Sequence, residues 1–495
     1  MNHAAPETDR LVLTLDLGSS SVRAMLYDQR GHGVPGISAQ ERYTLTPTTD
    51  GAAEDDPAAA LERVFRCIDA LLAQAGSLAE RIAAVAVDTM ASTFLALDAA
   101  DQPLTPLITY ADTRNSADAA ALQHHLAERE VHDRTGCLLR TSYWPARLTW
   151  LQRTQPAIRR MAARWLTLGE YLELQLFGIC RVSYSVASWS GLLDRRRLVW
   201  DAPLLEHLGV QPEQLAPLVD VDAPLRGLRA PFAARWPALR NVPWFPAVGD
   251  GAAANLGSGC IGPQRIALTL GTSGAMRVVL PEVAEVPAGL WCYRVDRRLA
   301  LLGGATSEGG NVYAWLFHIL RLADPAAVEA ALAAFPPDSH GLTVLPFLAG
   351  ERSPDWAGNI PLTVHGLTLA GTPIAIMRAS LEAVAYRFAI IQQRLNLPND
   401  AAQRLIASGS GLLNSPAWMQ IFADVLGRPL IAASEAEATS RGTALLALRS
   451  LGLLPDLAAA AEPEGAVYHP NHEHHAIYQA AIIRQQRLYE RLRTF

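Results

Sequence analysis

Two stretches of this chain place the same short polar turn between runs of alternating apolar residues. The first, LTLDLGSSSVRAMLYD (Leu13–Asp28), predicts a β-hairpin whose strands alternate on either side of Gly-Ser-Ser-Ser. The second, IALTLGTSGAMRVVL (Ile266–Leu280), repeats this design, with its turn glycine 253 residues after the first. A repeat at this distance is too long for a solenoid and indicates two related domains.

The apolar pattern between and after the hairpins predicts an α/β protein. In the first half, an amphipathic helix at 61–76 precedes a strand at 82–88, a helix-rich region at 115–240 and a strand-like run at 244–259. In the second half, the pattern predicts strands at 265–270 and 299–305, helices at 373–395 and 416–427, and an amphipathic helix from Ala476 onward.

Length and charge narrow the class of protein. The chain of 495 residues is too long for one ordinary core, so two or three domains are expected. With 50% hydrophobic residues, 18% charged residues and a net charge of −6, it resembles a globular enzyme. The negative charge disfavours nucleic acid and anionic membranes as main partners. No signal-peptide core or membrane-spanning apolar run is present, so a cytoplasmic protein is expected.

Cysteine and histidine spacing does not predict a metal or redox centre. The five cysteines are far apart and form no Cys-x-x-Cys pair, so we expect reduced, mostly buried thiols. The segment HPNHEHH (His469–His475) could bind a metal, but its composition is more typical of a solvated loop.

The two turns predict phosphate binding, because small residues let neighbouring backbone N–H groups point outward together. The residues concerned are Gly18, Ser19 and Ser20 in the first turn and Gly271, Thr272 and Ser273 in the second. Asp16 lies in the strand before the first turn, where a carboxylate is costly to bury. Mg²⁺ binds carboxylates together with phosphates, so we expect Asp16 to organise this ion. The alternative is an acid that caps the turn. Its counterpart in the second hairpin is Thr269.

The segment GDGAAANLGSG (Gly249–Gly259) predicts a catalytic acid. Asp250 stands between two glycines at the end of an apolar run, where it could accept a proton from a hydroxyl group. The small residues after it favour a tightly packed helix. The alternative is that Asp250 is a helix N-cap.

The segment ASGSGLLNSPAWMQIFADVLG (Ala407–Gly427) predicts a nucleotide contact. Its glycines permit close approach of a flat ring or a phosphate, and Asn-Ser-Pro begins a helix. The pattern does not match Gly-x-Gly-x-x-Gly and no ribose-binding acid follows, which disfavours a nicotinamide enzyme. The alternative is a plain strand-to-helix turn.

Taken in order from Leu11 to about Arg449, these motifs resemble the FGGY family of carbohydrate kinases. LDLGSSSVRA and LTLGTSG resemble its two phosphate hairpins, GDGAAANLGSG its catalytic-aspartate motif and SGSGLLNSPAWMQIFADVLGRPL its adenosine segment. TYADTR (Thr109–Arg114) is similar to the W-x-D-x-R stretch near the sugar, with Tyr110 in place of tryptophan. YWPARLTWLQR (Tyr143–Arg153) is similar to the first signature, with Arg147 where lysine is common, and ATSRGTALLA resembles the closing helix.

The resemblance implies two actin-like, ribonuclease-H-like domains around a central cleft. Residues 1–10 would form a tail, 11–258 the N-terminal, sugar-side domain, and 259–495 the C-terminal, ATP-side domain with its final helix. It implies Mg²⁺ and ATP, a small sugar or sugar-acid substrate, and a homodimer, since family members are often dimers. The implied site residues are Asp250 as catalytic base; Asp16 at the metal; Gly18, Ser19, Ser20, Gly271, Thr272 and Ser273 at phosphate; Gly310, Gly409, Ser410, Gly411 and Asn414 at the nucleotide; and Ser92, Asp112 and Asp250 at the sugar.

Departures from the family pattern bear on the substrate. MAST (Met90–Thr93) replaces the Gln-Met-His-Gly usual in xylulose kinases, and the Arg-Glu pair of glycerol kinases is absent. The segments at 303–316 and 345–359 look more like the gluconate-kinase-like branch, which favours a gluconate-like substrate. Within the second segment, Glu351 and Arg352 could clamp a sugar, but an ion pair that orders the loop is the favoured interpretation.

Three alternatives to a gluconate-like kinase stay open. One is a kinase of xylulose or another ketose, from the same family. Another is a non-catalytic actin-like ATP-binding regulator, which the presence of both Asp16 and Asp250 disfavours. The third is an ATPase of the chaperone or actin type, which would release ADP without any sugar.

Overall fold

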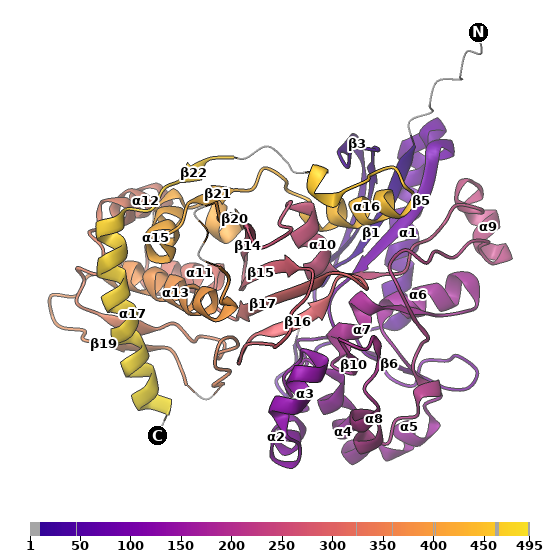
Figure 1. Cartoon of the computed structure of the whole chain (residues 1–495), viewed down its shortest axis with the longest axis horizontal. Coiled ribbons are helices and arrows are strands. Elements are labelled where there is room, and N and C mark those ends of the chain that lie inside the picture. Colours follow the sequence, from indigo (N-terminus) through magenta and orange to yellow (C-terminus); the bar gives the residue numbers. More distant parts are fainter. Residues whose placement is uncertain are drawn as a thin grey trace, which may run out of the picture. The chain divides into compact units, whose positions relative to one another are not determined.

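The structure is a computed structural model of the chain (Figure 1). It describes residues 10–45, 47–322, 324–358, 360–398, 400, 402–460 and 465–493. The predicted tail, residues 1–10, lies outside these ranges except for Arg10, which is exposed. None of the helices in the described ranges is both long and apolar enough to cross a bilayer.

The chain divides into two compact units. Unit 1 contains Met1–Gly259, Cys292–Leu301 and Glu437–Ala461, and unit 2 contains Cys260–Trp291, Leu302–Ala436 and Glu462–Phe495. This grouping differs from the predicted division at 258/259, because two later segments return to unit 1. Tyr293, in the first returning segment, has its hydroxyl 2.5 Å from that of Tyr143, and the second segment packs on the helix that begins at Asp250.

The central sheet of unit 1 has the strand order β13-β5-β1-β2-β3. The strands are β1 (Leu11–Leu17), β2 (Ser21–Tyr27), β3 (Gly33–Arg42), β5 (Ile82–Thr89) and β13 (Val248–Gly249). β1 and β2 form the predicted hairpin, whereas β5 runs parallel to β1, and β13 parallel to β5. Parallel strands end at the same edge of a sheet, so the residues at the ends of β1, β5 and β13 share one edge.

Helices cover this sheet and bury β1 along its whole length. α1 packs on β2 and β3, while α16 packs on β1, β5 and α10. The helices of unit 1 are α1 (Pro57–Ala75), α2 (Ser116–His125), α3 (Glu128–Thr135), α4 (Trp144–Thr154), α5 (Pro156–Met161), α6 (Leu168–Phe177), α7 (Tyr184–Ser190), α8 (Ala202–Leu208), α9 (Ala230–Arg235), α10 (Asp250–Gly257) and α16 (Ala438–Ser450). α1 begins four residues before the predicted helix, because the Asp56 side chain caps Ala59 N and proline follows at the first helical position.

The central sheet of unit 2 repeats this plan. Within unit 2 its order is β17-β15-β14-β20-β21-β22, so the hairpin β14–β15 takes the place that β1–β2 has in unit 1. β20 is parallel to β14, and β21 to β20, as β5 and β13 are in the first sheet. The strands are β14 (Arg265–Leu270), β15 (Gly274–Leu280), β17 (Ala300–Thr306), β20 (Arg404–Ser408), β21 (Leu430–Ala432) and β22 (Val467–Tyr468), whereas β16 (Trp291–Arg294) falls almost wholly in the segment that returns to unit 1. The predicted internal repeat is therefore confirmed.

The helices of unit 2 include the long α13, which begins and ends where predicted (Figure 1). They are α11 (Gly310–Ile319), α12 (Pro325–Ala334), α13 (Pro373–Leu395), α14 (Ser410–Leu413), α15 (Pro416–Leu426) and α17 (His472–Arg493). α17 begins four residues before the predicted Ala476. The Asn471 side chain accepts from Glu473 N at 2.9 Å, and His474 Nδ1 lies 2.8 Å from Asp424 Oδ2 on α15. Part of the histidine segment, predicted as a solvated loop, is therefore the start of a helix.

Candidate active site

Three aspartates lie at one edge of the unit 1 sheet, and we call them the acidic cluster. Asp16 and Asp88 are direct neighbours, since β1 and β5 pair in parallel with these two residues in register. Asp250 follows β13, whose last residue, Gly249, pairs with Thr89 at the end of β5. The structure thus brings the two predicted acids to the same edge and adds Asp88 on the strand between them.

Burial dominates the electrostatics of the acidic cluster. Asp88 is fully buried; its Oδ2 accepts a hydrogen bond from Thr443 Oγ1 at 2.8 Å, whereas its Oδ1 has no hydrogen-bond partner among the described residues. Burial and the charge of Asp16 raise the pKa of Asp88 well above its usual value. Burial also raises the pKa of Asp16, opposed by the charge of Arg23, whose guanidinium lies 3.7 Å away. These paired carboxyls form a set of oxygen ligands of the kind that Mg²⁺ prefers.

The first predicted phosphate turn lies against Asp16. Gly18 N donates to Ser21 O at 3.1 Å, and a Cβ at Gly18 would lie 3.3 Å from Asp16 Oδ1. Tyr43 holds the turn twice: its backbone N–H donates to Ser20 O at 3.0 Å, and its hydroxyl donates to Gly18 O. Ser20 is exposed, and Ser19 partly so. The turn is therefore fixed beside the acidic cluster, with its tip at the surface of unit 1.

Asp250 is the first residue of α10 rather than its N-cap, which is Gly249. Its Oδ1 accepts a hydrogen bond from Gly251 N at 2.6 Å, and the residue is partly exposed. The capping alternative therefore holds only in part. The Asp250 carboxyl accepts a hydrogen bond from an N–H of the first turn, as a cap does, but Asp250 itself lies within the helix. The positive end of a helix dipole favours an ionised carboxylate, which is the form able to accept a proton.

Glycines bring α10 into backbone contact with α16. A Cβ at Gly257 would lie 1.8 Å from Ala438 O, and one at Gly442 would lie 1.8 Å from Ala253 O. The prediction that the small residues after Asp250 form a tightly packed helix is confirmed. Thr443, which follows Gly442, is the residue that bonds Asp88, so this close packing also positions the acidic cluster.

In unit 2, predicted glycines from separate segments meet backbone to backbone, and we call them the glycine floor (Gly271, Gly310, Gly409 and Gly411). Gly310 N donates to Gly271 O at 2.7 Å. A Cβ at Gly411 would lie 3.0 Å from Gly271 O and 3.3 Å from Gly310 Cα. A Cβ at Gly310 or Gly411 would lie 2.7 Å or 2.9 Å from a backbone oxygen, which explains glycine at these positions. A Cβ at Gly271 would meet nothing within 4 Å, so this contact does not require glycine there.

Of these glycines, Gly409 has the backbone conformation that another residue would find hardest to adopt. Its φ is +90°, a value that other residues rarely adopt, and a Cβ would lie 2.5 Å from Leu270 O. The predicted polar residues around the floor are exposed: Thr272, Ser273, Ser410 and Asn414. The closely approaching backbone of the floor therefore has exposed polar residues next to it in sequence, and its contact with a nucleotide stays a prediction.

Thr269 occupies the position in the second hairpin that Asp16 has in the first. Its Oγ1 lies 2.9 Å from Ser408 Oγ and accepts a hydrogen bond from Arg277 at 2.9 Å. Ser408 is also its register partner on β20. The strand ends of this sheet therefore carry hydroxyl groups where those of unit 1 carry carboxyls.

The predicted sugar-contacting residues Ser92 and Asp112 lie on two loops of unit 1. Ser92 is in the left-handed region with φ +55°, and its hydroxyl donates to Ser142 O at 2.6 Å. Asp112 is buried, accepts from Ala53 N at 3.1 Å, and pairs with Arg114 at 2.6 Å. Both side chains therefore have partners within the protein, and their contact with a sugar stays a prediction.

Arg147 links these two loops from below the surface. Its buried guanidinium donates to Ser92 O and, at 2.7 Å, to Thr109 O. Trp144 Nε1, from the same helix, donates to Thr93 O at 3.0 Å. Burial lowers the pKa of Arg147 to about 9. The residue at the lysine position of the first signature thus positions loops through backbone carbonyls.

The ion-pair interpretation of Glu351 is confirmed, but its partner is not the neighbouring Arg352. Glu351 pairs with Arg387 of α13 and accepts a hydrogen bond from the Tyr489 hydroxyl of α17 at 2.5 Å. The Arg352 guanidinium lies over the Trp356 ring, 5.8 Å from its centre. The loop is therefore anchored to two helices of unit 2.

Among the described residues, the group of three whose ligand atoms lie close enough together to hold a metal ion is Asp338, His340 and Glu382, and the acidic cluster is not such a group. Glu382 is fully buried, but it already accepts from Arg378 at 2.6 Å and from His340 at 2.9 Å, so its charge is balanced. All five cysteines lie in described ranges and no disulfide joins them, as predicted.

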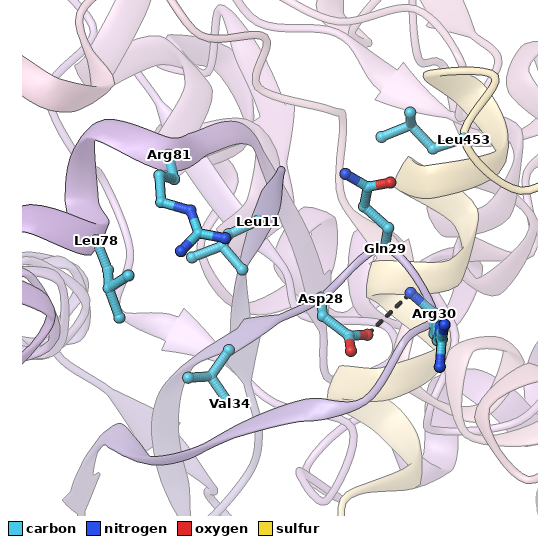
Figure 2. Close-up of a pocket in the computed structure, with 8 residues that line it drawn as sticks. All are labelled: Leu11, Asp28, Gln29, Arg30, Val34, Leu78, Arg81 and Leu453. Atoms are coloured by element: carbon cyan, nitrogen blue, oxygen red, sulfur yellow. Dashed lines mark hydrogen bonds between the residues drawn. The ribbon is translucent and has the colours of Figure 1, made fainter. Parts of the chain in front are cut away.

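A cavity of about 590 Å³ in unit 1 lies away from the acidic cluster (Figure 2). It is lined by Leu11, Asp28, Gln29, Arg30, Val34, Leu78, Arg81 and Leu453. Leu11 begins β1, whereas Asp16 lies near the other end of that strand. The lining includes none of the predicted site residues, so this cavity is separate from the candidate active site.

Sequence comparison identifies the family. Residues 11–257 match the N-terminal domain of the FGGY family of carbohydrate kinases, and residues 266–451 match its C-terminal domain. The chain belongs to the FGGY family of carbohydrate kinases. The predicted class of enzyme and the predicted fold of two actin-like, ribonuclease-H-like domains are confirmed. Kinases of this family use ATP.

Individual relatives act on different acceptors. A gluconokinase from Bacillus subtilis is 27% identical over 469 residues, which cover 92% of this chain and 91% of the relative. A glycerol kinase from Leptothrix cholodnii is 29% identical over 93% of this chain and 95% of the relative. The structure of gluconate kinase from Lactobacillus acidophilus superposes with a TM-score of 0.91, at 25% identity and 98% coverage of each chain. These similarities support a sugar or polyol kinase.

Sequence reasoning missed Asp88, Thr443 and Tyr43. A sequence signal could have identified Asp88. The apolar strand IAAVAVD ends in an acid, just as the strand before the first turn carries Asp16 near its end. Thr443 and Tyr43 had none, since each bonds residues that are distant in sequence.

Proposed function

We propose that this kinase transfers the γ-phosphoryl group of ATP to a hydroxyl of a small sugar, sugar acid or polyol, with a gluconate-like acceptor the best candidate. The observation that carries the proposal is Asp250 at the start of α10, on the same sheet edge as Asp16 and Asp88. The names of the gluconokinase and gluconate kinase relatives support the acceptor.

Asp250 serves as the general base. As the acceptor oxygen forms its bond to the γ-phosphorus, the carboxylate takes the hydroxyl proton, and ADP departs with the electron pair of the broken P–O bond. The helix dipole and the hydrogen bond from Gly251 N favour the ionised form that this step needs. Partial exposure of Asp250 lets an acceptor reach it.

Asp16, beside Asp88, would hold Mg²⁺ directly or through water, because both groups offer the oxygen ligands that this ion prefers. When bound, the ion supplies positive charge that offsets the negative charge of the phosphates. Arg23, 3.7 Å from Asp16, limits the repulsion between the two carboxyls.

The backbone N–H groups of the two Gly-Ser/Thr turns bind phosphate oxygens, and the glycine floor contacts the nucleotide. The exposed Ser20, Thr272 and Ser273 support the first assignment. The close backbone contacts among Gly271, Gly310 and Gly411 support the second, because glycine lets a base or sugar ring approach the backbone closely.

The test is ADP release with magnesium-ATP and one acceptor at a time: D-gluconate, xylulose, ribulose, sedoheptulose, glycerol, erythritol and fuculose. We expect release that depends on one acceptor and falls at least about 100-fold in Asp250→Asn, with ATP affinity within about twofold. Normal turnover by Asp250→Asn would contradict the base assignment.

The same panel separates the alternatives. Release with xylulose but not gluconate would identify the ketose branch, to which the xylulose kinase of Lactobacillus acidophilus belongs by name. Release without any acceptor would indicate an ATPase. ATP binding without release under any condition would indicate a regulator.

A further inference from the structure

Trp189 borders the backbone that carries Asp250. A Cβ at Gly249 would lie 2.5 Å from the indole Nε1 and 2.9 Å from Cε2, so the edge of the indole rests on the glycine just before Asp250. Contacts this short leave no room for any side chain at Gly249. The indole is therefore a large side chain in contact with the residue that precedes the proposed base.

Two serines, one just before α7 and one within it, fasten this helix to the strand that ends at Gly249. The Ser183 hydroxyl donates to Ala247 O at 2.5 Å, and Ser185 Oγ accepts a hydrogen bond from Gly249 N at 3.1 Å. These bonds lie on both sides of Val248, so α7 and the strand that ends at Gly249 form one rigid piece. Trp189 has a fixed position relative to Asp250 as a result.

An aromatic stack sets the orientation of the indole. Trp189 stacks on Tyr293 with ring centres 4.0 Å apart and planes 21° from parallel. The Tyr293 hydroxyl lies 2.5 Å from that of Tyr143, and both tyrosines are almost completely buried. Trp189 is partly exposed, so it is the member of this stack that reaches the surface of unit 1.

We propose that Trp189 is a specificity-determining residue whose indole packs against the carbons next to the reacting hydroxyl. This inference rests on the proposed function. A hydroxyl that gives its proton to Asp250 lies about 3 Å from the carboxylate, so the carbons attached to it meet the side chains bordering Asp250. The indole offers them an apolar surface, which suits C–H groups and disfavours a carboxylate. The acceptor therefore carries C–H groups beside its reacting hydroxyl, and any carboxylate lies at the far end of the molecule.

The test compares steady-state kinetics of Trp189→Phe and Trp189→Ala with the wild-type chain. We expect the KM for the acceptor to rise about threefold to tenfold in Trp189→Phe and further in Trp189→Ala, while the KM for ATP stays within twofold. Trp200→Phe is the matched control, since Trp200 is another partly buried tryptophan of unit 1, and it should leave both KM values unchanged. An acceptor KM within twofold of wild type in Trp189→Ala would overturn the inference.

A second variant tests the contact itself. Gly249→Ala places a methyl group against the indole and should lower kcat at least tenfold. Trp189→Ala in the same chain removes the clash, so the double variant should regain the kcat of Trp189→Ala alone. Failure of this rescue in a folded double variant would show that the indole does not govern the position of Asp250.

Direct binding separates this inference from the proposed function. Each acceptor is titrated against wild type and Trp189→Ala, with heat of binding as the readout. If an acceptor binds wild type without ADP release, the proposed function fails, and weaker binding by Trp189→Ala still supports the role of Trp189. Equal binding by both proteins, or no binding of any acceptor to wild type, overturns it.

Discussion

The two central sheets of this kinase have the same hairpin and the same order of parallel strands, yet opposite chemistry at their strand ends. In unit 1 the register partners at this edge are Asp16 and Asp88, whereas the corresponding partners in unit 2 are Thr269 and Ser408. One edge thus carries paired carboxyls and the other a pair of hydroxyls 2.9 Å apart.

Under the proposed function, the two copies of the fold divide one reaction between them. Carboxyls can accept protons and hold a cation, but they repel the phosphates of a nucleotide. An edge of hydroxyls and glycines has no such charge and lets a ligand approach the backbone closely. The acidic cluster is therefore suited to the chemistry, and the glycine floor to holding ATP.

Replacing Asp16 should have the largest effect on the difference between the two sheet edges. Asp16→Asn leaves unit 1 with an amide at its strand end, so we expect turnover to fall about 1,000-fold, because the charge that steadies the metal is lost. The Mg²⁺ concentration that gives half-maximal activity should also rise. The assay is ADP release measured over a range of Mg²⁺ concentrations at saturating ATP.

Asp28→Asn is the matched control for this variant. Asp28 follows β2 at the other end of the same hairpin, where its Oδ1 accepts from Arg30 N and His32 N, and an amide oxygen can replace it. Turnover of Asp28→Asn should stay within twofold of wild type. If Asp16→Asn were as active as this control, the assignment of the metal to the acidic cluster would fail.

A smaller effect concerns Glu308, a buried residue of unit 2 that lies two positions before Gly310 in the sequence and accepts a hydrogen bond from Ala349 N at 3.4 Å. Burial raises its pKa from the usual 4.5 to about 7. Because the folded-state pKa is above the unfolded one, its contribution to stability is complete below about pH 4.5 and is lost as the pH rises toward 7. From pH 5 to pH 8, the unfolding free energy of wild type should therefore fall by about 2 kcal/mol more than that of Glu308→Gln.

Urea denaturation of both proteins at a series of pH values measures this difference. Glu490→Gln, at an exposed position of α17, is the control and should follow the wild-type curve. If the unfolding free energies of Glu308→Gln and wild type changed with pH in parallel, Glu308 would ionise in the folded protein as easily as in the unfolded chain. That result would contradict this prediction.

Much of the fold follows from local sequence patterns. Both hairpins show apolar alternation around a small polar turn, and α13 has a capping threonine, Thr372, at its start. The tight packing of α10 follows from the small residues after Asp250. The hairpins and the start of α13 depend on neighbours within one turn or strand, which sequence displays directly, whereas the partner of α10, the distant α16, is not displayed in this way.

The remaining features depend on contacts between distant segments. The role of Asp88 follows only from its register with Asp16, which lies on the neighbouring strand. The start of α17 depends on Asp424 of another helix, and the return of Cys292–Leu301 to unit 1 depends on the tyrosine contact with Tyr143. Tertiary partners of this kind leave no periodic signal in the chain.

One paired measurement tests the division between the two edges most directly: the ATP dissociation constant and the turnover of Asp250→Asn and Gly409→Ala. Asp250→Asn should lose turnover while its dissociation constant for ATP stays within about twofold. Gly409→Ala, whose methyl group would lie 2.5 Å from Leu270 O, should weaken ATP binding at least about tenfold in a folded chain. Weakened ATP binding by Asp250→Asn together with unchanged binding by Gly409→Ala would contradict the account.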